Sequence, residues 1–192
     1  MMRKIVVLFL ILFLFSNTYC QSNLKTYTWE DVKDSNPDTV FSITFEKNKL
    51  DSIPIQLLKF TNLKKLDLSK NKLTHLPDSF VNLKQLEILD LGKNKFSKFP
   101  SEICKLTHLK KLVLNRNDIT TIPYLIINLT ELETLDIWDT PIISFPEQFV
   151  SMKKLKYIDA RGVTHGAAYQ KKWEEKLPWV KIEFDAPCNC IE

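Results

Sequence analysis

The feature that most constrains this chain is a pattern that repeats every 23 residues. Two independent sets of residues share this interval, one apolar and one of prolines. They are Val40, Leu63, Leu86, Leu109, Leu132 and Leu155, and Pro54, Pro77, Pro100, Pro123 and Pro146. A period of this length is typical of a stack of similar structural units. The chain is therefore expected to fold as a solenoid in which each unit packs mainly on its neighbours.

Within each unit the spacing of the apolar residues predicts one short strand and one crossover. Leu66 and Leu68, for example, are two residues apart, so they share one face of a strand while their neighbours face the other way. The Pro-x-x-Ile/Phe-x-x-Leu stretch that follows has the spacing of a helical turn. Proline suits the start of such a turn, because the N–H that proline lacks would have no partner there. Parallel strands need such a crossover. Because the helical side is bulkier, the stack should curve with its strands on the concave face.

Each unit reads LxxLxLxxNxLxxLPxxIxxLxx, most clearly between Leu63 and Leu83. This pattern resembles the leucine-rich repeat family, in its 23-residue class with a Leu-Pro step. Over residues 40–165 the resemblance implies an α/β leucine-rich repeat solenoid, a curved right-handed stack with parallel strands on the concave face and short helical or 3-10 crossovers on the convex face. Its implied role is non-enzymatic binding of a partner.

The same resemblance implies a ladder of buried asparagines that bond the loop backbone. The residues at this place are Asn48, Asn71, Asn94 and Asn117. Thr140 and Val163 occupy it in the fifth and sixth units, so the ladder is expected to weaken and then stop toward the C terminus.

The first residues have the pattern of a secretory signal peptide. Arg3 and Lys4 precede an unbroken apolar run of eleven residues, 5–15, which is too short to span a bilayer. Residues 1–20 are therefore interpreted as a signal peptide cleaved near Cys20, which predicts a secreted, periplasmic or cell-envelope protein. The alternative is a lipoprotein anchored through Cys20.

The two ends of a solenoid expose its core, so both are expected to carry caps. Residues 21–39 are interpreted as the N-terminal cap, in which Thr28 and Asp31 form a capping-box-like start. Residues 40–165 hold five full units and a partial sixth. Residues 166–192 are interpreted as a C-terminal cap with a helix and an edge strand. The helix is indicated by Ala168, Tyr169, Trp173 and Leu177, and the strand by Val180, Ile182 and Phe184, which alternate with charged residues.

Composition excludes several function classes. Only 3 of the 192 residues are glycine, too few for a glycine-rich phosphate cradle, and the pattern indicates no cofactor. The formal charge of +4 falls to +2 once Arg3 and Lys4 are removed with the leader, a balance that does not indicate nucleic acid as a partner. Beyond the leader, no segment is long and apolar enough to predict a transmembrane span. The sequence indicates no oligomeric state.

The cysteines offer weaker alternatives. Cys104 and His108 are four residues apart, but they fall on a crossover and at the start of a strand, so a thiol-dependent enzyme is less favoured than a binding module. Cys188 and Cys190 have only His165 nearby, fewer ligands than a zinc site needs. The repeat places Cys104 about 20 Å from this pair, whereas a disulfide needs Cα atoms within about 7 Å. The pair could bond to each other, bond to another molecule, or stay reduced.

The repeat also gives the columns of side chains that cross the concave face. One column is Thr44, Asp67, Asp90, Val113, Asp136 and Asp159; the next is Glu46, Ser69, Gly92, Asn115, Trp138 and Arg161; the third is Lys47, Lys70, Lys93, Arg116, Asp139 and Gly162. In the first strands these charges favour a solvated face.

The fifth and sixth strands differ because Trp138 and Tyr157 should project there. The candidate site comprises Trp138, Tyr157, Arg116, Arg161, Asp136 and Asp159. Aromatic residues and arginine carry much of the energy of protein interfaces, so the predicted partner is a protein. An alternative is a cell-envelope glycan stacked on the aromatic rings, with the cations from Lys47 to Arg116 contacting its anionic groups. Another is that Trp138 folds over the loop at 140–141.

Overall fold

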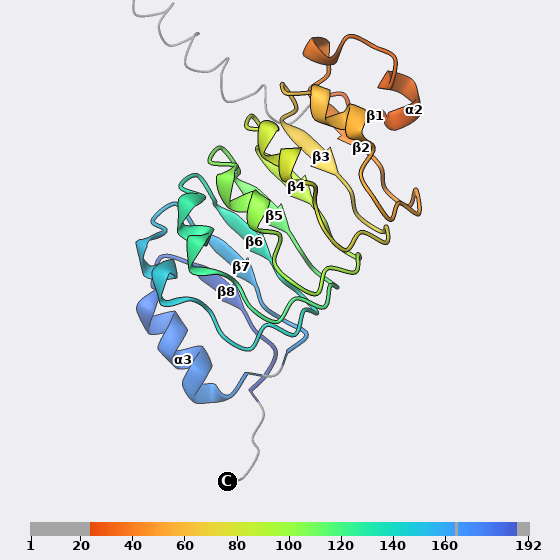
Figure 1. Cartoon of the computed structure of the whole chain (residues 1–192). Helices are drawn as coiled ribbons and strands as arrows, with labels where there is room; N and C mark the ends of the chain where they lie inside the picture. Colours follow the sequence, from red (N-terminus) through yellow and green to blue (C-terminus); the bar gives the residue numbers. More distant parts are fainter. Residues whose placement is uncertain (1–23, 164, 188–192) are drawn as a thin grey trace, which may run out of the picture.

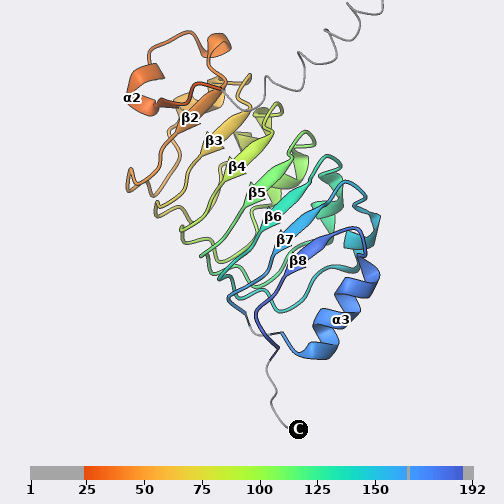
Figure 2. The same cartoon turned by 180° about the vertical axis from the view of Figure 1, so that it is seen from behind.

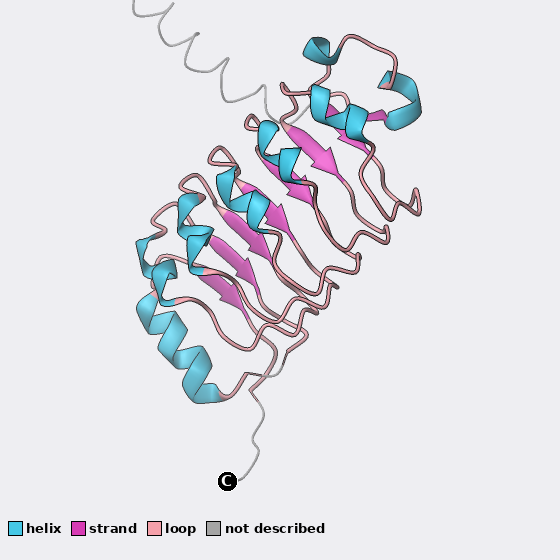
Figure 3. Cartoon of the chain, in the orientation of Figure 1, coloured by secondary structure: helices cyan, strands magenta, loops and turns pink. Residues whose placement is uncertain are grey.

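The computed structural model describes residues 24–163 and 165–187, which form one open sheet of eight parallel strands in chain order. Figures 1 and 2 show the strands side by side in one row, and Figure 3 shows the short helices gathered along the other side of that row. The strands are β1 (Tyr27–Thr28), β2 (Ser42–Thr44), β3 (Lys65–Asp67), β4 (Ile88–Asp90), β5 (Lys111–Val113), β6 (Thr134–Asp136), β7 (Tyr157–Asp159) and β8 (Lys181–Glu183). The predicted leader, Cys20, Cys188 and Cys190 lie outside the described residues.

The register of the sheet follows the 23-residue interval. Leu66 in β3 lies opposite Leu89 in β4, which lies opposite Leu112 in β5. These inward leucines are fully buried, and the core runs without interruption from the first strands to the C-terminal helix. The first predicted column, from Thr44 to Asp159, is therefore confirmed as a row of neighbours across the sheet.

Each crossover from β2 to β7 contains a 3-10 helix, as the spacing predicts. They are η2 (Ile55–Lys59), η3 (Asp78–Asn82), η4 (Ser101–Lys105), η5 (Tyr124–Asn128) and η6 (Glu147–Ser151), and each begins directly after one of the repeating prolines. The middle residue of each helix points into the core, as Phe80, Ile103 and Ile126 do with no exposed surface. Of the described residues, no helix is long and apolar enough to cross a membrane.

The asparagine ladder forms at three of the four predicted places. Asn71, Asn94 and Asn117 are buried, and each side-chain amide donates to a carbonyl of the preceding unit and to two of its own. Asn48 is exposed instead, because no earlier repeat loop lies beneath it. Thr140 is buried and its hydroxyl donates to the Ile137 carbonyl, so the ladder weakens there as predicted.

The residue before each asparagine position has a left-handed backbone. The φ angles are 60° at Lys47, 57° at Lys70, 55° at Lys93, 51° at Arg116 and 53° at Asp139. This conformation is unfavourable for residues with a Cβ, so the turn that follows each strand is set by the solenoid rather than by local preference. In the sixth unit the place is taken by Gly162, with a φ of 91°.

Replacing Gly162 with alanine is expected to lower the free energy of unfolding by about 2 kcal/mol. An added Cβ would lie 2.5 Å from both Cα and N of Asp139, which are backbone atoms that cannot rotate away. Gly92→Ala is the matched control, because its Cβ would first meet the side-chain oxygen of Asn115, which can move. Urea denaturation of both variants measures the difference, and equal losses would contradict this explanation.

Both ends of the sheet are covered. At the start, β1 pairs with β2 and leads into α2 (Trp29–Val32), where the Asp31 carboxylate accepts from the backbone N–H of Thr28 at 3.0 Å and from its hydroxyl at 2.6 Å. The 3-10 helix η1 (Pro37–Thr39) follows. The sequence did not predict β1, because two residues are too few to show an alternating pattern. At the other end lie α3 (Ala167–Lys176) and β8, and the latter pairs with β7.

Candidate functional site

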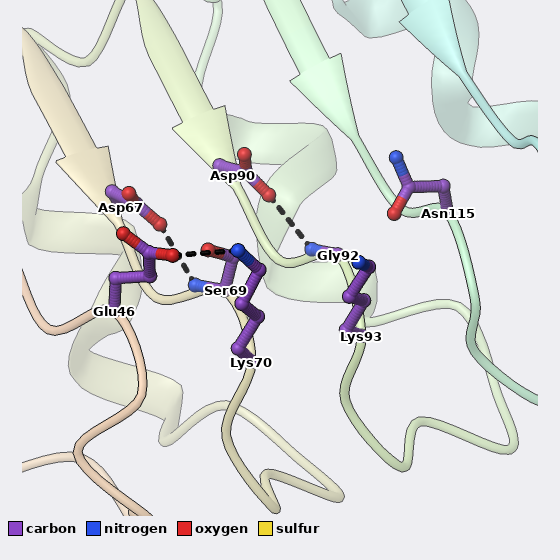
Figure 4. Close-up of a pocket in the computed structure, with 8 residues that line it drawn as sticks. All are labelled: Glu46, Asp67, Ser69, Lys70, Asp90, Gly92, Lys93 and Asn115. Carbon is purple, nitrogen blue, oxygen red and sulfur yellow. Dashed lines mark hydrogen bonds and ion pairs between the residues drawn. The ribbon is translucent and has the colours of Figure 1, made fainter.

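The concave face holds a hollow of about 330 Å³ over β3 to β5 (Figure 4). It is lined by Glu46, Asp67, Ser69, Lys70, Asp90, Gly92, Lys93 and Asn115. The hollow forms where Gly92 contributes no side chain between Ser69 and Asn115. The sequence predicts only a solvated charged face here. The hollow was not predicted, although Gly92 in the second column marks its place.

The aspartates of the first column hold the turns that follow their strands. In Asp67 and Asp90, Oδ1 accepts the backbone N–H two residues later, at 2.9 and 2.8 Å. Asp136 does the same for Trp138 at 3.0 Å. Burial raises the pKa of Asp90, the hydrogen bond from Gly92 opposes that shift, and the charge of Asp67 adds to it. These carboxylates are therefore fixed in position, and each has at least one oxygen already occupied.

Three of the predicted site residues come together around Trp138. Its indole ring is partly exposed, and the Arg116 guanidinium carbon lies 4.3 Å from the ring centroid. The Arg116 Nε is 3.3 Å from the Asp139 carboxylate. Asp136 accepts from the Trp138 backbone and, through Oδ2, from the side-chain amide of Asn115 at 2.8 Å. A cation stacked on an indole and held by a carboxylate is a preorganised, amphipathic surface.

The other three predicted residues form a second group, in β7 and the turn that follows it. Arg161 donates to both Asp159 oxygens, from Nε at 2.9 Å and from Nη2 at 2.6 Å. Burial acts to raise the pKa of Asp159, but the hydrogen bonds and charge of Arg161 outweigh it and the pKa is lowered. Tyr157 lies beside them, and burial together with a hydrogen bond to Glu183 raises its pKa to about 12.

Strand β8 also contributes to this second group, which was not predicted from the sequence. Glu183 lies 3.5 Å from Nε of Arg161, and Lys181 lies 5.7 Å from the centroid of the Tyr157 ring. The signal was the alternation of charged and apolar residues around Ile182, which placed these two side chains on the exposed face. The pair Arg161–Asp159 is therefore part of a network that joins β7 and β8 rather than an isolated pair.

The convex side contains the thiol that the sequence offered as an alternative. Cys104 is buried in η4 beside a cavity of about 600 Å³ between η3, η4 and η5. Burial, followed by the charge of Glu102, raises the pKa of Cys104 to about 11. His108 Nδ1 lies 3.0 Å from the Lys84 carbonyl oxygen. A thiolate nucleophile needs a lowered pKa, so this environment acts against thiol catalysis.

Alkylation of Cys104 in the folded protein is expected to be slow at pH 8 and to keep accelerating toward pH 11. The reason is that only the thiolate reacts, and its pKa is raised to about 11. Mass spectrometry of the peptide that contains Cys104 separates its labelling from that of the other cysteines. Cys104 in the urea-unfolded chain is the control, and its pKa should be about 8.5. If the pKa of Cys104 in the folded protein were at or below that value, a thiol enzyme would again be a candidate.

No group of three or more His, Cys, Asp or Glu residues in segments 24–163 and 165–187 is placed to hold a metal ion. The zinc alternative depended on Cys188 and Cys190, which lie outside those segments.

Comparisons with known proteins agree on one family. A profile described as a leucine-rich repeat region matches residues 88–171, and a leucine rich repeat profile matches residues 41–96. No curated protein matches the chain by sequence.

Two solved structures resemble the fold. One is a leucine-rich repeat protein of Leptospira interrogans, which is 24% identical over 85% of this chain and 49% of that chain, with a TM-score of 0.65. The other is the leucine-rich repeat ectodomain of the membrane receptor kinase GASSHO1/SCHENGEN3 from Arabidopsis thaliana, in complex with Casparian strip integrity factor 2. It is 28% identical over 78% of this chain and 18% of that chain, with a TM-score of 0.63. This chain thus spans about half the length of the first and under a fifth of the second.

Proposed function

We propose that this chain, which belongs to the leucine-rich repeat family, is an exported module that binds a protein partner through its concave face around Trp138. The family and the receptor ectodomain that it resembles support a protein-binding role. Export is proposed from the apolar leader at residues 5–15. The observation that carries the choice of surface is the stack of Arg116 on the partly exposed ring of Trp138.

This surface has the physical properties of an interface centre. Trp138 offers a large apolar area, and its neighbours Arg116 and Arg161 are each already oriented by a carboxylate. Side chains that are held before binding lose less conformational entropy when a partner arrives. The charged groups around the ring then form a polar rim, which is the common arrangement in protein interfaces.

The alternative partner, a cell-envelope glycan, needs aromatic faces that are open for stacking on sugar rings. Arg116 covers one face of Trp138, with its guanidinium carbon 4.3 Å from the centroid, and Lys181 lies near the Tyr157 ring. The partly covered rings therefore favour a protein partner over a glycan.

Replacing Trp138 with alanine is expected to weaken binding to the partner by about 30-fold or more, which corresponds to about 2 kcal/mol. The partner is first captured on the mature chain from an envelope and extracellular fraction, and its affinity for each variant is then measured by calorimetry. Trp179→Ala is the matched control, because this tryptophan is 37% exposed and also carries a stacked cation, Lys153. Full affinity in the Trp138 variant would show that the partner binds elsewhere.

A further inference from the structure

One edge of the concave face carries cations in every unit from the first to the fourth. The sequence Lys-Asn-Lys occurs three times at the 23-residue interval, and Arg-Asn-Asp follows. The basic edge is defined as Lys47, Lys49, Lys70, Lys72, Lys93, Lys95 and Arg116. The central asparagines of the second and third copies are buried in the ladder, so the flanking lysines leave the solenoid at fixed places on either side.

The backbone of the basic edge is rigid. Lys70 N–H donates to the Gly92 carbonyl at 2.9 Å, and Lys93 N–H donates to the Asn115 carbonyl at 2.8 Å. On the other side of the asparagines, Lys72 N–H donates to the Leu50 carbonyl at 2.7 Å, and the Lys95 N–H makes the equivalent bond one unit later. Strand spacing places successive lysines about 4.8 Å apart at the backbone. The edge is therefore a regular double row of positive charge.

Holding cations in these places is unfavourable for the isolated chain in two ways. Lys47, Lys49, Lys70, Lys93 and Arg116 all have positive φ, a conformation that glycine or asparagine adopts more readily. Like charges on neighbouring strands also repel each other. The fifth and sixth units use Asp139 and Gly162 at the same place, so the backbone geometry does not require a cation.

One other row of charges on the solenoid is neutralised between units. Glu87 lies 3.6 Å from Lys64 and 2.7 Å from Lys110, and Glu133 lies 2.7 Å from Lys156, so the row that precedes the strands alternates in sign. On the basic edge, Glu46 pairs with both Lys70 and Lys47, and Asp139 pairs with Arg116. Among the described residues, the remaining four lysines of the edge, Lys49, Lys72, Lys93 and Lys95, make no ion pair of this kind.

We propose that the basic edge binds an acidic, extended segment of the protein partner, whose Asp and Glu carboxylates pair with the lysines that the chain itself leaves unpaired. This inference rests on the proposed function and adds the chemistry of the partner. The edge is continuous with the Trp138 surface, because Arg116 is its last cation and also stacks on the indole. One partner chain can therefore contact both.

The hollow beside the edge offers partners for both the backbone and the side chains of an acidic peptide. Figure 4 shows Lys70 and Lys93 on consecutive loops, with Asp67 and Asp90 above them at the ends of their strands. The backbone N–H groups of a peptide can donate to these carboxylates while its acidic side chains accept from lysine. The four exit loops span about 15 Å, which an extended peptide covers with about five residues.

The test uses a fluorescent decapeptide of alternating Glu and Ser, with a Gln–Ser peptide and polygalacturonate as comparison probes. Affinity is measured by fluorescence anisotropy for the two peptides, and by competition for the polysaccharide, at low ionic strength. The edge variant is Lys49→Gln, Lys72→Gln, Lys95→Gln. The control variant, Lys59→Gln, Lys84→Gln, Lys105→Gln, removes the same charge from exposed lysines of the convex side. Thermal unfolding verifies that both variants remain folded.

The wild type is expected to bind the Glu–Ser peptide and not the Gln–Ser peptide. The edge variant should lose at least tenfold in affinity, and the control variant less than twofold. Equal losses in both variants would overturn the proposal, because total charge alone would then explain binding. Binding of polygalacturonate without binding of the acidic peptide would also overturn it.

The captured partner separates this inference from the proposed function. If Trp138→Ala loses the partner and the edge variant keeps it at full affinity, the proposed function stands and the acidic-segment inference fails. If the edge variant loses the partner while Trp138→Ala keeps it, the basic edge stands and the Trp138 surface is wrong. Loss with both variants supports one partner chain that crosses the whole face.

Discussion

Replacing Asn94 with alanine is expected to lower the free energy of unfolding by about 3 kcal/mol or more. The side-chain amide donates to the carbonyls of Leu68 at 3.0 Å, Leu91 at 2.9 Å and Gly92 at 3.3 Å. Its oxygen accepts from the Leu73 N–H at 3.1 Å. These groups lie inside the loop stack, where water does not replace the lost partners, and each unsatisfied group costs about 1–3 kcal/mol.

Asn48→Ala is the matched control for this prediction. Asn48 has the same place in the first unit, but its side chain is exposed, so its replacement should change stability by about 0.5 kcal/mol or less. Urea denaturation at one temperature measures both variants, and the difference between the two midpoints isolates the ladder. Similar losses at the two positions would mean that the asparagine acts through local turn preference rather than through bonds between units.

The same pair of asparagines shows what the sequence could predict about the fold. The 23-residue interval fixes which residues face inward, so the strands, their parallel register and the crossovers after each proline were predicted correctly. Whether an asparagine of the ladder is buried depends on the unit before it, and a consensus pattern does not describe that unit. For this reason Asn48 was wrongly predicted to be buried. The strand β1 was missed because its pairing to β2 is a tertiary contact between segments of unlike sequence.

For the candidate site, the sequence predicted positions but not partners. Column assignments placed Arg116, Trp138 and Arg161 on one face. In the structure the Arg116 N–H donates to the Trp138 carbonyl, and the Asp139 N–H donates to the Arg161 carbonyl, so the three residues follow consecutive strands. Which carboxylate each arginine selects is decided by side-chain conformations across neighbouring strands. Arg116 pairs with Asp139 in the next unit, and Arg161 pairs with Asp159 two residues before it and with Glu183 in β8. The use of these residues in binding stays a prediction.

Replacing Trp173 with alanine is expected to lower the free energy of unfolding by about 3–5 kcal/mol. Trp173 is 1% exposed, and its ring centroid lies 5.4 Å from that of Phe145 and 6.4 Å from that of Phe149. It belongs to α3, which is packed at the end of the last repeat (Figure 1). Truncation removes a large apolar side chain and leaves a cavity that the surrounding rings cannot fully close.

The part of the solenoid that loses stability in the Trp173 variant shows whether Trp173 acts as part of a cap or as an ordinary core residue. Repeat stability is a sum of nearest-neighbour terms, so weakening α3 should first expose the unit beneath it. Native-state hydrogen exchange is therefore expected to show faster opening of β7 and β8, while β3 and β4 keep most of their protection. Trp179→Ala, at 37% exposure, should cost about 1 kcal/mol or less and leave this pattern unchanged. Uniform loss of protection from β2 to β8 would instead mean that the solenoid unfolds as one cooperative unit and that α3 stabilises all repeats equally.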